Sequence, residues 1–384
     1  MIYLDNAATT WPKPPSVRTA VTNAFLCYGA NPGRAGHDVS LKTAEMVWSC
    51  RLAVAKLFGV SQPEHVVFTA NCTASLNVVI HSLAKRGGHV ILSDLEHNAV
   101  LRPLYAYAKQ GDLIYDIAVT DPASAENTVR NFERLIRPTT TAIICTQASN
   151  VFGVAPPIRQ IGEMAHRHGI WMVVDGAQGA GVIPTDLVQD HIDVYCAPGH
   201  KGLYGPMGTG ILCTQGAFPL QPLLYGGTGT QSLERGQPAV LPESLESGTL
   251  NVPGIAGLYA GVQSVLQTGV ETIARHEHAV LYPLYHALSR CGITLYNHWK
   301  ELEHGAPVLS FNVADLHSET VAAKLNEHHI ACRAGLHCAP LAHRKYHTVR
   351  QGTVRIAPSR YTTAKEIEAV EKVIKNIQNI TKSH

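Results

Sequence analysis

Val174-Asp175-Gly176-Ala177-Gln178 and, shortly after it, Pro198-Gly199-His200-Lys201-Gly202-Leu203 are the stretches that decide the fold of this 384-residue chain. The first sets a carboxylate at the end of an apolar run, and the second sets a lysine in a glycine-flanked turn. In open α/β sheets, functional groups gather just beyond the carboxyl ends of the strands. A lysine amine can bond an aldehyde, and a carboxylate can keep a ring nitrogen protonated. Alone, the pair is also compatible with a solvated loop lysine and a strand-end aspartate.

Short apolar runs around these stretches predict an α/β fold with a mostly parallel sheet. Between residues 64 and 213 the runs alternate with helical patterns, and each is followed by Gly, Ser, Asn or Asp. Runs this apolar are typical of strands that are buried on both faces. Helical spacing predicts helices over 73–85 and 158–168, which Gly87 and Gly169 would end. The expected strands contain Val66-Val67-Phe68, Val90-Ile91-Leu92, Ala142-Ile143-Ile144-Cys145, Trp171-Met172-Val173-Val174, Ile192-Asp193-Val194-Tyr195 and Gly210-Ile211-Leu212-Cys213.

After Pro253 the pattern becomes that of a smaller α+β domain. A long helical segment comes first, and the later elements are a strand at 308–311, a helix over 318–326, a strand at 352–356 and an amphipathic helix from 363. We therefore expect a large domain formed by 15–253. The small domain would comprise 1–14 and 254–384, with the N-terminal residues folding back onto it.

The composition favours an enzyme that acts on small molecules and resides in a reducing compartment. Hydrophobic residues make up 45% and charged residues 16%, which excludes a disordered chain. The net charge of +2 gives no field that would favour nucleic acid or an anionic membrane. The chain has no apolar run of membrane-spanning length and no leader pattern, so we expect a cytoplasmic protein. Nine cysteines without a C-x-x-C pair argue against disulfides and against a zinc site, and no metal is expected.

Seven motifs follow one another in a fixed order along nearly the whole chain. They are Tyr3-Leu4-Asp5-Asn6-Ala7-Ala8-Thr9-Thr10, Glu96-His97-Asn98, Ser149-Asn150-Val151-Phe152-Gly153, Val174-Asp175-Gly176-Ala177-Gln178, Gly199-His200-Lys201, Gly248-Thr249 and Arg333-Ala334-Gly335-Leu336-His337-Cys338-Ala339. With them the chain resembles the pyridoxal phosphate (PLP) enzymes of the class V aminotransferase fold, specifically the cysteine desulfurase and selenocysteine lyase family. The resemblance implies an aspartate aminotransferase-like fold. The last motif resembles the R-x-G-x-H-C-A loop of one branch, with Leu336 in place of a frequent histidine.

The resemblance implies roles for the residues near Lys201. Lys201 would bind PLP covalently and act in catalysis, and Asp175 would contact the ring nitrogen. His97 would stack on the ring and, as a catalytic residue, could also transfer protons. Asn150 and Gln178 would be neutral donors beside the ring hydroxyl, although amides at strand ends also commonly satisfy turn backbone. These side chains would together form the cofactor site.

The cofactor phosphate would bind at a helix start. Asn71-Cys72-Thr73 precede an apolar helix, whose first N–H groups form an anion site, and His200 would add a donor. Thr249 resembles the threonine that reaches the phosphate of the neighbouring subunit, which implies a homodimer with shared active sites. Pro198 replaces a common serine and has neither hydroxyl nor N–H. Cys72 stands where threonine is frequent, so we expect weak cofactor retention.

Cys338 would carry the specific reaction that the resemblance implies, conversion of L-cysteine to L-alanine. Its thiolate would take the sulfur as a persulfide and pass it to an acceptor protein or a small thiol. His337 and Arg333 are expected to favour the thiolate. Taken alone, the cysteine could equally be a buried structural residue.

The substrate would be bound by a second group of residues. Arg355 resembles the arginine that binds the substrate α-carboxylate through two parallel hydrogen bonds. Arg333 and Asn150 would assist it, and His37 sits where family members place an active-site histidine. Three other functions stay open at this point: selenocysteine lyase, an aminotransferase of the same fold, and a non-catalytic scaffold or sulfur-carrier partner.

Overall fold

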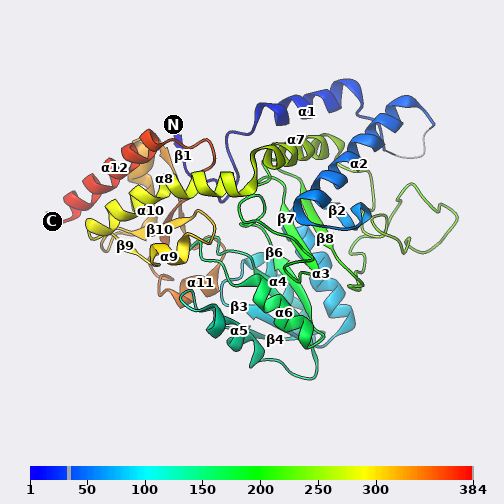
Figure 1. Ribbon diagram of the computed structural model, residues 1–384, viewed down its shortest axis with the longest axis horizontal. Helices are drawn as coiled ribbons and strands as arrows, with labels where there is room; N and C mark the ends of the chain where they lie inside the picture. Colours follow the sequence, from blue (N-terminus) through cyan, green and yellow to red (C-terminus); the bar gives the residue numbers. More distant parts are fainter. Residues whose placement is uncertain (33–35, 383–384) are drawn as a thin grey trace.

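The computed structural model describes residues 1–32 and 36–382. Two sheets organise it, a seven-stranded sheet and a four-stranded sheet that lie side by side (Figure 1). The strands of the larger sheet run in the order β2-β8-β7-β6-β5-β3-β4. Strands β4, β3, β5, β6 and β7 are parallel to one another, and β8 is antiparallel to both β7 and β2. The larger sheet comprises β2 (Val66–Thr69), β3 (His89–Ser93), β4 (Ile114–Ala118), β5 (Thr140–Thr146), β6 (Trp171–Asp175), β7 (Val194–Pro198) and β8 (Gly210–Thr214).

The expected mostly parallel sheet is therefore confirmed, with one strand added. Strand β4 lies at the edge of the sheet, and its residues are largely exposed. An edge strand does not show the continuous apolar run that marks a strand buried on both faces, so the sequence did not predict it. The strand predicted at 192–195 is shifted towards the C-terminus, because β7 begins at Val194.

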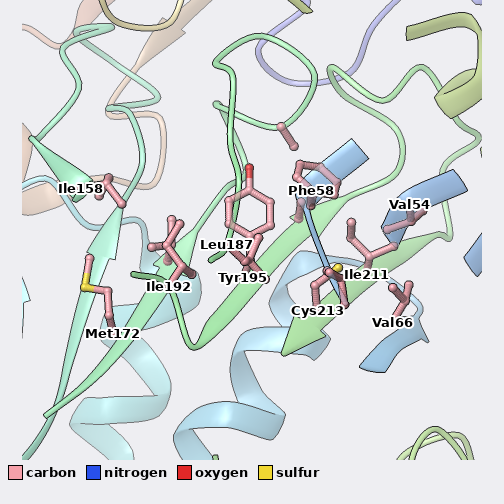
Figure 2. Packing of buried hydrophobic residues seen from close by; sticks show 14 of the residues in the cluster. Val54, Phe58, Val66, Ile158, Met172, Leu187, Ile192, Tyr195, Ile211 and Cys213 are labelled. Atoms are coloured by element: carbon pink, nitrogen blue, oxygen red, sulfur yellow. The ribbon is translucent and has the colours of Figure 1, made fainter. Parts of the chain in front are cut away.

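Helices cover both faces of the larger sheet and explain the apolar runs. On one face, residues such as Ala142 and Ile144 pack against α3 (Cys72–Arg86) and α4 (Asn98–Gln110). On the other face, Ile143 and Cys145 pack in a cluster with α2 (Asp38–Phe58), α6 (Ile158–Arg167) and α7 (Val252–Thr268). Figure 2 shows part of this second cluster, in which the rings of Phe58 and Tyr195 lie 4.9 Å apart. Successive residues of each strand point to opposite faces of the sheet. Because helices cover both faces, the residues on each face must be apolar.

The smaller sheet is antiparallel and has the order β12-β13-β10-β9. Its strands are β9 (Thr294–Leu295), β10 (Leu309–Asn312), β12 (Arg333–Gly335) and β13 (Thr353–Ile356), and the helices of this region are α8 (Val270–Arg290), α9 (Trp299–Leu302), α10 (Ser318–Glu327), α11 (Pro340–Lys345) and α12 (Ala364–Lys382). The N-terminus folds back as expected, because β1 (Ile2–Tyr3) pairs in parallel with β11 (Ile330–Ala331) beside this sheet (Figure 1).

The long helical segment expected after Pro253 is two helices. The break falls at Gly269, whose φ of 85° is a left-handed conformation that favours glycine. Helix α7 packs against α1 (Pro15–Cys27) and α2, whereas α8 packs against α12. The expected division into 15–253 and the two flanking segments stays a prediction. Among the described residues, no helix is long and apolar enough to cross a membrane.

A tight turn at Gly181 holds the loop after β6 against the Lys201 turn. Gly181 has φ +79°, and a Cβ added there would lie 2.2 Å from the carbonyl oxygen of Gly202. Gly169 has a similar φ of +67°, but an added Cβ would meet nothing within 4 Å. The two glycines therefore share the conformational constraint, and only Gly181 has the steric one.

We expect Gly181→Ala to destabilise the protein more than Gly169→Ala. The control should lose about 1 kcal/mol from the unfavourable φ alone. Gly181→Ala should lose about 1–3 kcal/mol more, because its Cβ overlaps backbone that cannot move freely. Urea unfolding followed by circular dichroism measures both losses. Equal losses for the two variants would contradict the predicted overlap.

Candidate functional site

One cavity of about 190 Å³ lies at the carboxyl ends of β6 and β7. Polar groups from five segments of the chain line it, and most were predicted from the sequence. The lining residues are Asn71, Cys72, Thr73, His97, Ala99, Thr146, Asn150, Asp175, Ala177, Gln178, Pro198, His200 and Lys201. The structure thus brings together all eight residues that were expected to hold the cofactor within one subunit.

Lys201 and Asp175 are held there by adjacent parallel strands. Asp175 is the last residue of β6 and is 1% exposed. Its Oδ1 accepts hydrogen bonds from the backbone N–H of Ala177 at 2.9 Å and from the Cys72 thiol at 3.5 Å. The Lys201 amine donates no hydrogen bond to any described residue. Burial, assisted by the charge of Arg355, lowers the pKa of Lys201 to about 8, although Asp175 acts in the opposite sense.

The ring of His97 is fixed by the start of α4. Its Nδ1 accepts a hydrogen bond from the backbone N–H of Ala99 at 3.0 Å, so the neutral ring carries its proton on Nε2. Burial lowers the pKa of His97, which keeps the ring neutral at ordinary pH. A flat, neutral ring at the cavity wall is suited to stacking against an aromatic ligand.

The other end of the cavity is suited to an anion. Asn71 caps α3 by accepting a hydrogen bond from the N–H of Ala74 at 2.9 Å. Cys72 and Thr73 form the first turn of that helix, where N–H groups lack partners within the helix. The Nδ1 atom of His200 is buried and has no hydrogen-bond partner among residues 1–32 and 36–382. Burial lowers the pKa of His200 to about 4, so the ring can donate or accept as a neutral group.

Arg355 and Arg333 lie opposite each other on β13 and β12, and directly opposed side chains share a face of the sheet. Arg355 is 2% exposed, whereas Arg333 is exposed. Arg355 donates to the carbonyl oxygen of Asn150 and to Oδ1 of Asp5, both at 2.8 Å. Through the carbonyl of Asn150, which lines the cavity, Arg355 is attached to the cavity wall. Its guanidinium is suited to binding a carboxylate.

Cys338 is exposed on a loop that is tethered to the cavity wall. The N–H of Asn98, at the start of α4, donates to the carbonyl oxygen of Cys338 at 2.8 Å. The side-chain amide of Asn150 donates to the carbonyl oxygen of His337 at 2.7 Å. Both loop residues adopt left-handed conformations, with φ of 48° for His337 and 58° for Cys338. The backbone of His337 and Cys338 is therefore held beside residues that line the cavity or adjoin its lining.

The expected role of His337 in favouring the thiolate is wrong. Its ring is buried, and its Nε2 lies 3.1 Å from the carbonyl oxygen of Thr353. Burial lowers the pKa of His337 to about 2, so the ring is neutral and cannot stabilise an anion by its charge. Arg333 remains as the cationic neighbour in the loop sequence.

Two predicted residues lie away from the cavity. His37 is exposed and caps α2, accepting a hydrogen bond from the N–H of Ser40 at 3.2 Å. The preceding residues 34 and 35 fall outside the described part of the chain. Thr249 lines a separate cavity of about 460 Å³ near Gly248. The expected contact of Thr249 with a neighbouring subunit remains a prediction.

Asp5, Lys13 and Asn98 contact the site but were assigned no role from the sequence. Asp5 bonds Arg355, and Lys13 donates to the carbonyl oxygen of His200 at 2.6 Å. Asn98 acts through its backbone, which no residue pattern reveals. Asp5 lies in the first motif of the sequence, and this is the one signal that could have singled it out.

Comparison with known proteins gives consistent matches over the whole chain. The family model described as "Aminotransferase class-V" matches residues 2–370. A probable cysteine desulfurase of Mycolicibacterium paratuberculosis is 31% identical over 98% of this chain and 55% of its own length. A probable cysteine desulfurase of Methanothermobacter thermautotrophicus is 31% identical over 98% of this chain and 94% of its own. This chain thus spans about half of the first relative and nearly all of the second.

Solved structures give the same result. The apo structure of a cysteine desulfurase from Thermococcus onnurineus NA1 has a TM-score of 0.89 at 30% identity, covering 98% of this chain and 94% of that one. The cysteine desulfurase CsdA from Escherichia coli has a TM-score of 0.88 at 28% identity, with the same coverage.

The exposure of Cys338 predicts selective alkylation. In the native protein, iodoacetamide should modify Cys338, which is exposed, well before Cys145 and Cys196, which are buried in strands. Peptide mapping by mass spectrometry during a time course measures the order of modification, and the unfolded protein serves as the control in which all react. Modification of Cys338 as slow as that of Cys196 would contradict the exposure of the Cys338 thiol.

Proposed function

The chain belongs to the Aminotransferase class-V family, and we propose that it is a PLP-dependent cysteine desulfurase that converts L-cysteine to L-alanine. The observation that carries the proposal is an exposed thiol, Cys338, on a loop whose backbone is tethered to the wall of a cavity that contains Lys201 and Asp175. The named cysteine desulfurases among its relatives support the same activity.

The residues of the cavity fit PLP. The Lys201 amine has no competing hydrogen bond to any residue that the structure describes and would hold the aldehyde carbon, while Asp175 would contact the ring nitrogen. Asn150 and Gln178 would lie beside the ring hydroxyl, and His97 would cover the ring face. The phosphate would accept hydrogen bonds from the first N–H groups of α3, from the Thr73 hydroxyl and from Nδ1 of His200, which has no partner among the described residues. When bound, PLP supplies an electron sink for the electrons released at the substrate α-carbon.

Lys201 and Arg355 would prepare the substrate. Arg355 binds the α-carboxylate with paired hydrogen bonds, which also fixes the direction of the Cα–H bond. Arg333 adds a second positive charge at this end. The Lys201 amine, whose pKa is about 8, can then take the α-proton on Nζ near neutral pH.

Cys338 would perform the sulfur transfer. Its thiolate attacks the substrate sulfur, forming an S–S bond while the Cβ–S bond breaks. The carbon retains the electron pair and gains a proton, so the products are L-alanine and a Cys338 persulfide. The terminal sulfur then passes to an acceptor protein or a small thiol, because the persulfide lies on an exposed loop.

We place this enzyme in the cytoplasm as a homodimer with shared active sites. Large apolar side chains are exposed on α1 and on the long loop that leads to Thr249, and such surface is typical of protein interfaces. Thr249 would contact the phosphate in the partner's cavity. These exposed side chains are Phe25, Leu26, Leu223, Leu224, Tyr225 and Leu233.

Selenocysteine lyase is the nearest rival, because a selenol leaves more readily than a thiol. If the protein were an aminotransferase, Cys338 would have no role in the reaction. If it were a non-catalytic scaffold, it would need none of the cavity residues. Incubation with cysteine, selenocysteine and cysteine sulfinate in turn, followed by measurement of alanine, ranks these functions.

Cys338→Ala should lower sulfide and alanine production from L-cysteine by about a hundredfold or more, because no other nucleophile replaces the thiol. The visible absorbance of the cofactor should be unchanged. Cys27→Ala, which removes another exposed thiol, is the control and should keep full activity. Retained selenide release in Cys338→Ala would favour the lyase, and retained transamination would favour the aminotransferase.

The pKa of Lys201 predicts how cofactor uptake depends on pH. Because burial lowers this pKa to about 8, the neutral, nucleophilic amine becomes dominant above that pH. The rate of PLP uptake by the apoenzyme, followed by visible absorbance, should therefore rise between pH 7 and about 9 and then level. Lys201→Ala should lose this dependence. A rate that keeps rising towards pH 10.5, the ordinary lysine value, would contradict the lowered pKa.

A further inference from the structure

The segment Asp5–Lys13, here called the N-terminal strap, contacts both ends of the candidate site. On the cofactor side, Thr9 and Lys13 donate hydrogen bonds to the carbonyl oxygen of His200, and Thr10 donates to that of Lys201 at 3.0 Å. The side-chain amide of Gln178 donates to the strap at Ala7, at 3.0 Å. On the substrate side, Asp5 bonds Arg355.

The backbone around Asp5 is held from several directions. Asp5 forms a parallel bridge with Ala357, the residue that follows β13. Ala357 N–H donates to the carbonyl oxygen of Leu4 at 2.8 Å, and the side-chain amide of Asn6 donates to that of Ala357 at 2.9 Å. The backbone carbonyl oxygen of Asp5 accepts from the N–H of Ala8 at 3.0 Å. The backbone that carries the Asp5 carboxylate is therefore held in place, as an orienting residue requires.

The hydrogen bonds of Arg355 leave donors for a ligand. A guanidinium group has five N–H donors. Asp5 takes one through a single carboxylate oxygen at 2.8 Å, and the carbonyl of Asn150 takes another. Within the described part of the chain, the Nε atom of Arg355 is buried without a hydrogen-bond partner. An unpartnered buried donor on an arginine that is fixed on two sides indicates a place where an acceptor binds.

We propose that Asp5 is a positioning residue for substrate binding. It holds the Arg355 guanidinium so that the remaining N–H groups of Arg355, including that of Nε, donate hydrogen bonds to the α-carboxylate. The proposal deepens the proposed function and rests on it. Without Asp5, Arg355 would keep one anchor, the carbonyl of Asn150, and its buried charge would face Arg333 uncompensated. The guanidinium would then be more mobile in the free enzyme, so substrate binding would cost more conformational entropy.

An opposite role is conceivable, in which Asp5 competes with the substrate for Arg355. A competitor would occupy the guanidinium with both oxygens and would have to leave. Asp5 instead uses one oxygen and is fixed by its backbone, while further donors stay available. The two roles predict opposite changes in substrate affinity when the carboxylate is removed.

The test measures KM and kcat for L-cysteine, and the Kd for L-alanine by calorimetry, in the holoenzyme. Asp5→Ala should raise KM and Kd about tenfold or more while kcat changes less than about threefold. Asp5→Asn keeps an oxygen acceptor but loses the charge, so it should show an intermediate rise of about threefold. Asp315→Ala, at an exposed aspartate, is the control and should match the wild type.

Cofactor absorbance and circular dichroism report whether each variant is folded and loaded. An unchanged or lowered KM in Asp5→Ala would overturn the proposal. If Asp5→Ala does not fold, Asp5→Asn decides instead, and a KM equal to that of the wild type would overturn the proposal. A fall in kcat with KM unchanged would also overturn it. A wild-type protein that forms no alanine from cysteine refutes the proposed function instead, which keeps the two failures distinct.

Discussion

Burial of the Lys201 amine among the carboxyl ends of parallel strands is the constraint on which the site depends. Burial away from water favours the neutral amine, and the neighbouring arginine charges act in the same direction. Asp175 reaches the same cavity because β6 and β7 are adjacent and parallel, so their ends meet at one edge of the sheet. The helices on both faces exclude water from this edge and make the burial possible.

Segments that are distant in sequence complete the cavity. The N-terminal strap carries Asp5, β13 carries Arg355, and the loop before α11 carries Cys338. All three are tied to the larger sheet's loops by hydrogen bonds to backbone carbonyl groups, such as those of Asn150 and His200. The acceptors in these ties are backbone groups, whereas several donors are side chains at the site, namely those of Asn150, Gln178 and Arg355.

The sequence predicted those parts of the fold that leave a local pattern. Six of the seven central strands were found because both faces are buried, while β4 was missed because an edge strand lacks that continuous apolar run. The eight residues expected to hold the cofactor were singled out through short motifs at strand or helix ends, and they line one cavity. The contact of Asp5 with Arg355 joins opposite ends of the chain, and no local pattern can specify it. The neutrality of His337 depends on burial by surrounding segments, which is a tertiary property.

The left-handed pair His337 and Cys338 limits how the thiol-bearing turn can be transferred to another protein. Neither residue is glycine, and each such conformation is unfavourable by about 1 kcal/mol or more unless surrounding contacts enforce it. The enforcing contacts come from Asn98 and Asn150, which belong to other segments. A heptapeptide excised from this chain and grafted elsewhere would relax to an extended backbone and aim its sulfur in a different direction. A designer who wants to reuse this turn must transplant its two amide donors as well.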